Sequence, residues 1–206
     1  GFVTKDADRS YRLGVQTMLL GDQARRQSPL IAAAEPYVNE LYDRLNENVL
    51  LIVRHDLQSA CILLRSSPDR DKIFADFGRT GPLHAGGGPK ILLAHAPASV
   101  QEQVMASELQ GFTPNTIQDP DELRRMLEKI RLDGWTLSDG EIDEHKRSIA
   151  TPVRDASGTV VAALSVTGSS DRLQDDLLIQ TREALLTTAG RLSVALGYRG
   201  APVVVS

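Results

Sequence analysis

A glycine-rich run in this chain could bind a small anion. Residues 86–90 read Gly-Gly-Gly-Pro-Lys and come directly before the apolar segment 91–94, which looks like the first turns of a helix. Free N–H groups at the start of a helix attract anions, and glycines let a ligand approach the backbone closely. Gly87 and Gly88 are therefore candidate binding residues, and a flexible turn before the helix is the alternative.

A pair of hydroxyl groups on one predicted strand could bind the same kind of ligand. Residues 147–168 contain two apolar runs on either side of a turn-type cluster at 155–158, so they predict a hairpin. Because side chains alternate across a strand, Ser165 and Thr167 share one face with Ala163. Two hydroxyls on an otherwise apolar face can hold a small polar ligand, and they can equally be ordinary strand residues.

Other chemistry-bearing residues do not form a recognisable catalytic or metal site. Pro89 separates the glycines from the lysine, so the glycine run is not a nucleotide P-loop. His55 and His84 could each serve a nucleophile such as Ser148, but the sequence identifies no third group to orient them. The acidic cluster at 139–145 fails the EF-hand spacing, and a solvated loop is expected there. We therefore expect no catalytic residue, no metal ion and no cofactor.

Composition describes an ordinary globular protein of 206 residues, with 41% hydrophobic and 24% charged residues. No apolar run approaches the roughly 20 residues of a membrane span, and no secretory signal opens the chain. The single cysteine, Cys61, excludes an internal disulfide framework and lies in an apolar segment, so we expect a packed core thiol in a cytoplasmic protein. The net charge of -4 does not favour general nucleic-acid binding by the chain as given.

Hydrophobic periodicity predicts the elements that must position the candidate groups. Helical spacing predicts helices over about 14–23, 30–46, 120–132 and 172–196. Apolar runs predict strands at 49–53 and 59–64, a further strand near 73–77, and the hairpin at 147–168. Asp119, Pro120 and Gly134 mark the two ends of the third helix. Hairpin-type connections predict an antiparallel sheet with helices packed on it, which is an α+β architecture.

The first residues predict a second, isolated hairpin. Residues 2–13 read as strand, polar turn and strand, and a free two-stranded hairpin is marginal in water. The chain does not begin with Met, so we expect a fragment that lacks an N-terminal portion. Basic residues exceed acidic residues by one in this hairpin, which is compatible with contact to a phosphate backbone. The basic residues are Lys5, Arg9 and Arg12.

Four motifs spread along the chain carry a resemblance to a known family. They are Tyr11-Arg12-Leu13-Gly14, Pro82-Leu83-His84-Ala85 followed by glycines and Lys90, Thr113-Pro114-Asn115-Thr116-Ile117, and Arg147-Ser148-Ile149-Ala150 through Val166-Thr167-Gly168. In this order and at about this spacing, they resemble the effector-binding domain of the IclR family of bacterial transcriptional regulators. The resemblance implies a GAF-like fold, an antiparallel sheet flanked by helices. It implies that 1–14 is the C-terminal wing remnant of a winged helix-turn-helix DNA-binding domain, 15–28 a linker helix and 29–206 the effector-binding domain.

The resemblance also implies a binding site and partners. It maps the family's effector pocket, which holds small carboxylates or aromatic acids in several members, onto Gly87, Gly88, Ser148, Ser165 and Thr167. The family can add a carboxylate from 138–139, where Asp139 either binds a ligand hydroxyl or forms a turn with Gly140. Pro89 departs from the family's pattern, in which glycine directly precedes the lysine, and could narrow or reshape the pocket. The implied partners are a small-molecule effector, operator DNA through the mostly absent N-terminal domain, and further copies in a homodimer or tetramer, with no membrane.

These inferences together predict a ligand-responsive, DNA-binding transcriptional regulator. Lys5, Arg9 and Arg12 would lie at the DNA-contacting wing, and effector binding would control operator binding through rearrangement of the oligomer. One alternative is a GAF-like small-molecule sensor module of another signalling protein. A second alternative is an enzyme that acts on a small acid.

Overall fold

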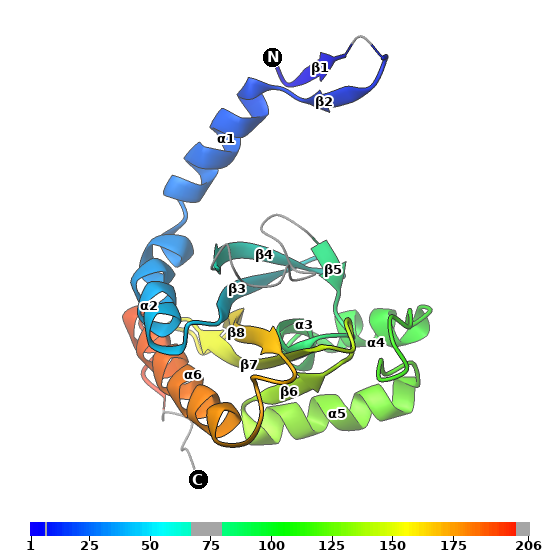
Figure 1. The fold of residues 1–206 in the computed structure, drawn as a ribbon, viewed down its shortest axis with the longest axis vertical. Coiled ribbons are helices and arrows are strands. Elements are labelled where there is room, and N and C mark those ends of the chain that lie inside the picture. The colour runs from blue at the N-terminus through cyan, green and yellow to red at the C-terminus, as the bar shows by residue number, and fades with distance from the viewer. Residues whose placement is uncertain (7, 67–79, 201–206) are drawn as a thin grey trace.

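A six-stranded antiparallel sheet forms the centre of the molecule (Figure 1). The computed structural model describes residues 1–6, 8–66 and 80–200. The strand order is β5-β4-β3-β8-β7-β6, and every neighbouring pair is antiparallel. The strands are β3 (Asn48–His55), β4 (Gln58–Arg65), β5 (Thr80–Pro82), β6 (Thr136–Asp139), β7 (Lys146–Arg154) and β8 (Val160–Ser169). This arrangement confirms the predicted α+β fold.

Helices cover the two faces of this sheet. The helices are α1 (Val15–Arg26), α2 (Pro29–Leu45), α3 (Gly87–Ala94), α4 (Ala98–Ala106), α5 (Pro120–Asp133) and α6 (Asp175–Ala195). One buried cluster joins α2 and α6 to the sheet, and the other joins α3 and α5 to the opposite face. The predicted strand at 73–77 and the tail at 201–206 lie outside the described residues.

Strand β8 shows how the alternating pattern divides the two faces. Leu164 and Val166 are fully buried in the cluster with α2 and α6, whereas Ala163 belongs to the cluster with α3. Because alternate side chains point to opposite faces, Ser165 and Thr167 face α3, as the sequence predicted. The turn between β7 and β8 places Gly158 at a φ of 83°, a value that glycine adopts readily.

Local signals set the helix ends where they are strong. The Asp119 carboxylate accepts hydrogen bonds from the backbone N–H groups of Asp121 and Glu122, and Gly134 ends α5 with a φ of 72°. These contacts confirm the predicted boundaries of α5. Two predicted helix ends were wrong by three residues. Helix α1 continues to Arg26, and α6 begins at Asp175, where no side chain caps the first turn.

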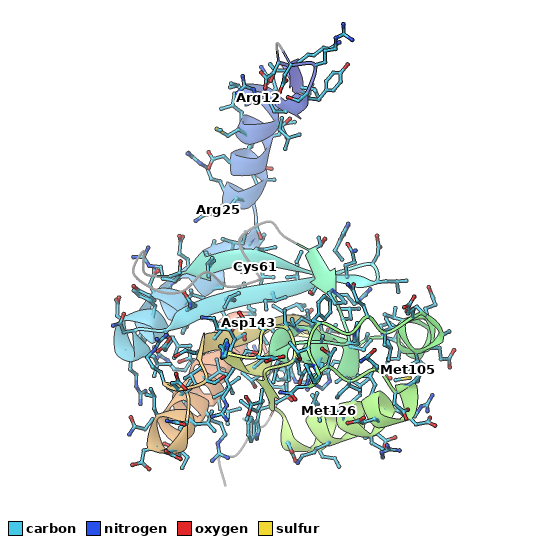
Figure 2. The ribbon with its side chains drawn as sticks, turned by 45° about the vertical axis from the view of Figure 1, so that its right-hand side comes forward. Arg12, Arg25, Cys61, Met105, Met126 and Asp143 are labelled. Carbon is cyan, nitrogen blue, oxygen red and sulfur yellow. The ribbon has the colours of Figure 1, made fainter. Side chains whose placement is uncertain are left out.

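The N-terminal segment stands apart from the body as an arm. It consists of β1 (Val3–Lys5), β2 (Tyr11–Leu13) and α1 (Figure 1). No residue of α1 is buried, and Figure 2 shows Arg12 on the arm, away from the sheet, and Arg25 at the base of the arm. Within the described residues, no helix is both long enough and apolar enough to cross a bilayer.

Candidate functional site

A cavity of about 90 Å³ lies between the start of α3 and the sheet. Five of the predicted binding residues line it: Gly87, Gly88, Ser148, Ser165 and Thr167. The walls also include the apolar side chains of Leu50, Ile52, Cys61 and Ile142. The volume is small beside the roughly 300–1,000 Å³ of sites for drug-sized ligands, so it suits a ligand of few atoms.

A row of polar side chains crosses four strands on the cavity face. Ser138 on β6 lies opposite Ser148 on β7, Ser148 lies opposite Thr167 on β8, and Thr167 lies opposite Asn48 on β3. Ser138, Ser148 and Thr167 all line the cavity. The hydroxyls of Ser138 and Thr167 form no hydrogen bond with any other described residue. We call Ser138, Ser148, Thr167 and Asn48 the polar row.

The start of α3 offers fewer free N–H groups than its sequence suggested. Gly87 N–H donates to Ser148 Oγ at 3.1 Å, and Gly86 N–H donates to Glu141 Oε2 at 3.0 Å. Pro89 has no N–H, which leaves Gly88 as the one residue of this turn whose N–H has no partner among the described residues. The expectation of two free backbone donors is therefore corrected to one.

The two predicted glycines also have a packing role. A Cβ atom on Gly87 would lie 2.9 Å from Ser148 Oγ, and one on Gly88 would lie 2.4 Å from Ile52 Cδ1. Both distances are shorter than ordinary contacts, so a side chain at either position would force Ser148 or Ile52 to shift. The glycines thus allow the helix start to pack closely against the sheet beside the cavity.

Ser165 and Thr167 differ in what they can offer to a ligand. Ser165 is 1% exposed, and its hydroxyl donates to the Ile149 carbonyl at 3.1 Å. Its oxygen can therefore accept a hydrogen bond from a ligand but its proton is already used. The Thr167 hydroxyl can still both donate and accept a hydrogen bond, so Thr167 is the stronger candidate of the two.

Asp139 does not line the cavity, which corrects its place among the candidate binding residues. Its carboxylate accepts a hydrogen bond from Arg147 Nη2 at 2.8 Å. That bond raises the pKa of Arg147 above its usual value, against the opposing effect of burial. Alternation along β6 is the reason, because it turns Ser138 towards the cavity and Asp139 away. Gly140, with a φ of 67°, forms the turn that the sequence offered as the alternative.

A buried ion pair beside the cavity was missed by the sequence analysis. Glu141 is only 6% exposed, so it departs from the expected solvated loop, whereas the other members of the acidic cluster at 139–145 are exposed. Its carboxylate pairs with the ammonium group of Lys90, whose residue is 0% exposed. The Glu141 backbone carbonyl accepts a hydrogen bond from Thr116 Oγ1 at 2.5 Å. No pattern in the sequence around Glu141 indicated that this carboxylate is buried.

The remaining candidates lie apart from the polar row or at its edge. His84 Nε2 lies 2.9 Å from the Gln110 carbonyl, and the His55 side chain is 72% exposed, so neither of these two candidate histidines is hydrogen-bonded to Ser148. Lys146 lines the cavity and adds a cationic side chain to it. Cys61 is buried, as predicted, and Figure 2 shows it on the sheet. The described residues contain no cluster of metal-binding side chains.

The predicted wing residues gather on the arm. Lys5 Nζ lies 5.6 Å from the centre of the Tyr11 ring, Arg12 pairs with Asp6 at 2.7 Å, and Arg9 adopts a φ of 70° in the turn. All of them are far from the cavity in the fold, at the free end of α1 (Figure 1).

The fold and the cavity define a small α+β domain with a cavity lined by both polar and apolar groups between α3 and the sheet. Residues 23–194 match the family model described as bacterial transcriptional regulator IclR C-terminal. The chain belongs to this family, which confirms the resemblance read from the four motifs.

Similar proteins agree with this assignment. The Pca regulon regulatory protein of Pseudomonas putida is 31% identical over 196 residues, which are 93% of this chain and 66% of that protein. The crystal structure of the Thermotoga maritima IclR matches with a TM-score of 0.84 and 26% identity, over 96% of this chain and 81% of that one. An IclR homolog from Microbacterium hydrocarbonoxydans, in complex with 4-hydroxybenzoate, matches with a TM-score of 0.82 and 28% identity. The match covers 95% of this chain and 80% of that one. This chain thus spans just under two thirds of the Pseudomonas putida relative.

Proposed function

We propose that this chain is the effector-sensing part of a transcriptional regulator and that its cavity binds a small carboxylic acid. The observation that carries the proposal is the polar row facing the start of α3 across one cavity. A carboxylate accepts hydrogen bonds only, and this site presents hydroxyl groups with unused protons beside the positive end of a helix.

The parts of the site have complementary roles in this proposal. Gly88 N–H, Ser138, Ser148 and Thr167 donate to the carboxylate, and Lys146 contributes positive charge at the cavity wall. Leu50, Ile52 and Ile142 surround the apolar body of the acid. The relative that holds 4-hydroxybenzoate supports an aromatic acid as the first compound to test. Asp139 acts through Arg147 rather than on the ligand.

The arm links the sensing domain to DNA in this proposal. Residues 1–14 are the remnant of the wing, 15–28 the linker helix and 29–206 the effector-binding domain. The end of the arm carries Lys5, Arg9 and Arg12, and the wing would contact operator DNA there. An effector changes operator binding only through a different affinity for the two states of the regulator, here two arrangements of a homodimer or tetramer.

The first experiment is thermal unfolding of this chain with 4-hydroxybenzoate and with its neutral amide, followed by aliphatic acids and their amides. An acid at 100 times its dissociation constant should add about 2.7 kcal/mol to the free energy of unfolding. Stabilisation by an acid and none by its amide is the expected result. Equal stabilisation by acid and amide would contradict carboxylate recognition.

A pair of variants then assigns the binding to the polar row. Replacing Ser138→Ala and Thr167→Val together removes two hydroxyls that have no partner among the described residues, so the fold should persist. The loss of charge-assisted hydrogen bonds should weaken acid binding by about tenfold or more, measured by calorimetry. Thr181→Val is the matched control, because it removes a buried, unpartnered hydroxyl on α6 outside the cavity. Unchanged affinity in the double variant would refute the assignment.

A further inference from the structure

A group of charged residues lies on the face of the sheet behind the cavity. Because side chains alternate along a strand, the neighbours of Ser148 and Thr167 point to the face opposite the cavity. These neighbours are Arg147, part of which also lines the cavity, and Gly168, and they lie opposite each other on β7 and β8. The polar row is therefore backed by a second row on the face that α2 and α6 cover.

Two ion pairs on this rear face are joined through the connection between β8 and α6. Arg172 donates from Nε and Nη2 to the two carboxylate oxygens of Glu47, at 2.7 and 3.2 Å, and Glu47 is 2% exposed. Arg147 donates from Nη2 to Asp139 and from Nη1 to the Leu173 carbonyl at 3.1 Å. Because residues 172 and 173 are adjacent, a movement of one pair displaces the other. We call Asp139, Arg147, Arg172 and Glu47 the rear charge network.

Thr167 in the cavity wall is held closely against this network. A Cβ atom on Gly168, the next residue, would lie 2.7 Å from Glu47 Oε2. Asn48, the residue after Glu47, donates from Nδ2 to the Thr167 carbonyl at 3.2 Å. Close-packed groups transmit displacement rather than absorb it, so a shift of β8 at Thr167 presses directly on the Glu47 carboxylate.

The same carboxylate sits at one end of α2. Helix α2 ends at Leu45, Asn46 caps it with a φ of 50°, and Glu47 follows. The other end of α2 leads into α1 and the hairpin, as Figure 1 shows. Glu47 therefore lies between the cavity wall and the helix that carries the arm.

The rear face also contains polar atoms that this arrangement leaves unsatisfied. Arg147 Nε and Ser170 Oγ are buried and have no hydrogen-bond partner among the described residues. Buried donors are nearly always partnered in folded proteins, since an unsatisfied one costs free energy. In a second arrangement of the rear charge network, these donors could gain hydrogen-bond partners. That gain would offset the free-energy cost of moving the ion pairs, so the network could have two arrangements of similar free energy.

We propose that the rear charge network transmits occupancy of the cavity to α2 and through it to the arm. Glu47 and Arg172 are positioning residues in this mechanism. Glu47 follows the end of α2 and lies against Gly168, the residue after Thr167, and Arg172 pairs with Glu47, whereas neither lines the cavity. The inference rests on the proposed function, since it needs the cavity to be the sensing site. Its test uses no ligand, so its failure is distinguishable from a failure to find an effector.

The test measures hydrogen exchange of the α2 backbone amides in this chain. Thr167→Leu places apolar atoms in the cavity and stands in for an occupant, and Thr167→Val is a milder version. Each should change the exchange rates of the α2 amides by about threefold or more. The reason is that a change at Thr167 that reaches α2 alters the free energy of its local opening. In a Glu47→Gln/Arg172→Gln background the same change should disappear. The proposal would be overturned if neither Thr167 variant changes the hydrogen exchange of α2, or if the change is equal in the two backgrounds.

Two further variants separate transmission from general stability. Glu40→Gln/Arg191→Gln removes an exposed ion pair that also joins α2 to α6, and the response to Thr167→Leu should survive it. Arg172→Lys keeps the charge but loses the paired hydrogen bonds, so the response should fall partway. The readout is the difference in α2 exchange between Thr167 and its variant, measured within each background. As in a double-mutant cycle, a loss of stability that is common to both proteins cancels in this difference. Loss of the response in the Glu40/Arg191 background would also contradict the proposal.

Discussion

The Lys90–Glu141 pair shows how single residues hold the start of α3 against the sheet. The Glu141 carboxylate accepts from Gly86 N–H and pairs with the Lys90 ammonium group, with both residues buried. The protein thus places a carboxylate of its own at the first turn of α3, next to the position proposed for the ligand's carboxylate. In the proposed function the acid therefore binds through Gly88 N–H and the hydroxyls, because the N–H groups of Gly86 and Gly87 already donate within the protein.

Breaking this pair on one side should be costly. Lys90→Met leaves the Glu141 charge buried without its cation, which should lower the free energy of unfolding by roughly 3–5 kcal/mol in urea titrations. Lys90→Met combined with Glu141→Gln removes both charges and keeps a group that can accept from Gly86, so it should be less destabilised than the single variant. Lys129→Met, in an exposed pair with Asp133, is the control and should change stability by about 0.5 kcal/mol or less. A double variant less stable than Lys90→Met would contradict this account.

At the scale of elements, α5 is the helix whose boundaries follow from local chemistry. Its buried stripe of Leu123, Leu127 and Ile130 packs in the same cluster as α3. Its first turn is satisfied by the Asp119 carboxylate, and its end lies at a glycine in the left-handed region. The helix therefore supports α3 from behind, on the side away from the sheet.

Removing the cap should weaken the whole domain by a small, measurable amount. Asp119→Ala leaves the N–H groups of Asp121 and Glu122 without their acceptor, which should cost about 1 kcal/mol of unfolding free energy. Chemical denaturation measures the loss. Glu128→Ala, on the exposed middle of α5, is the comparison and should be neutral or slightly stabilising because alanine is a good helix former. Equal effects of the two substitutions would mean that the cap does not contribute.

At the scale of the whole molecule, the arm and the body differ in how much apolar surface they bury. The body buries two clusters on either side of its sheet, whereas α1 buries nothing and exposes Met18, Leu19 and Leu20. The body's stability therefore depends on its own core. The arm leaves these apolar side chains exposed to solvent in this chain.

Deleting residues 1–27 should consequently leave the body folded. Ser28 is kept because its side chain accepts the Ile31 N–H at the start of α2. The deletion removes exposed interactions, such as the Arg25–Glu35 pair, which are worth about 0–1 kcal/mol each. The melting temperature should therefore stay within a few degrees, as roughly 2–4 °C corresponds to 1 kcal/mol at this size. A collapse of the melting transition would show that the arm is part of the folding unit.

The sequence by itself determined the features that depend on neighbours along the chain. Periodicity and caps predicted α2, α5 and the β7–β8 hairpin, and alternation placed Ser165 and Thr167 on one face, because these signals act within a few residues. Four short motifs were enough to indicate the family and its fold.

The tertiary structure decided what depends on residues far apart in the chain. Ser138 rather than Asp139 faces the cavity because the sheet register turns it that way. Glu141 is buried because it meets Lys90 across about 50 residues of chain, and no local pattern distinguishes it from its solvated neighbours. The N–H groups of the glycine run looked free in the sequence, and only their packing against Ser148 and Glu141 shows that most are already used.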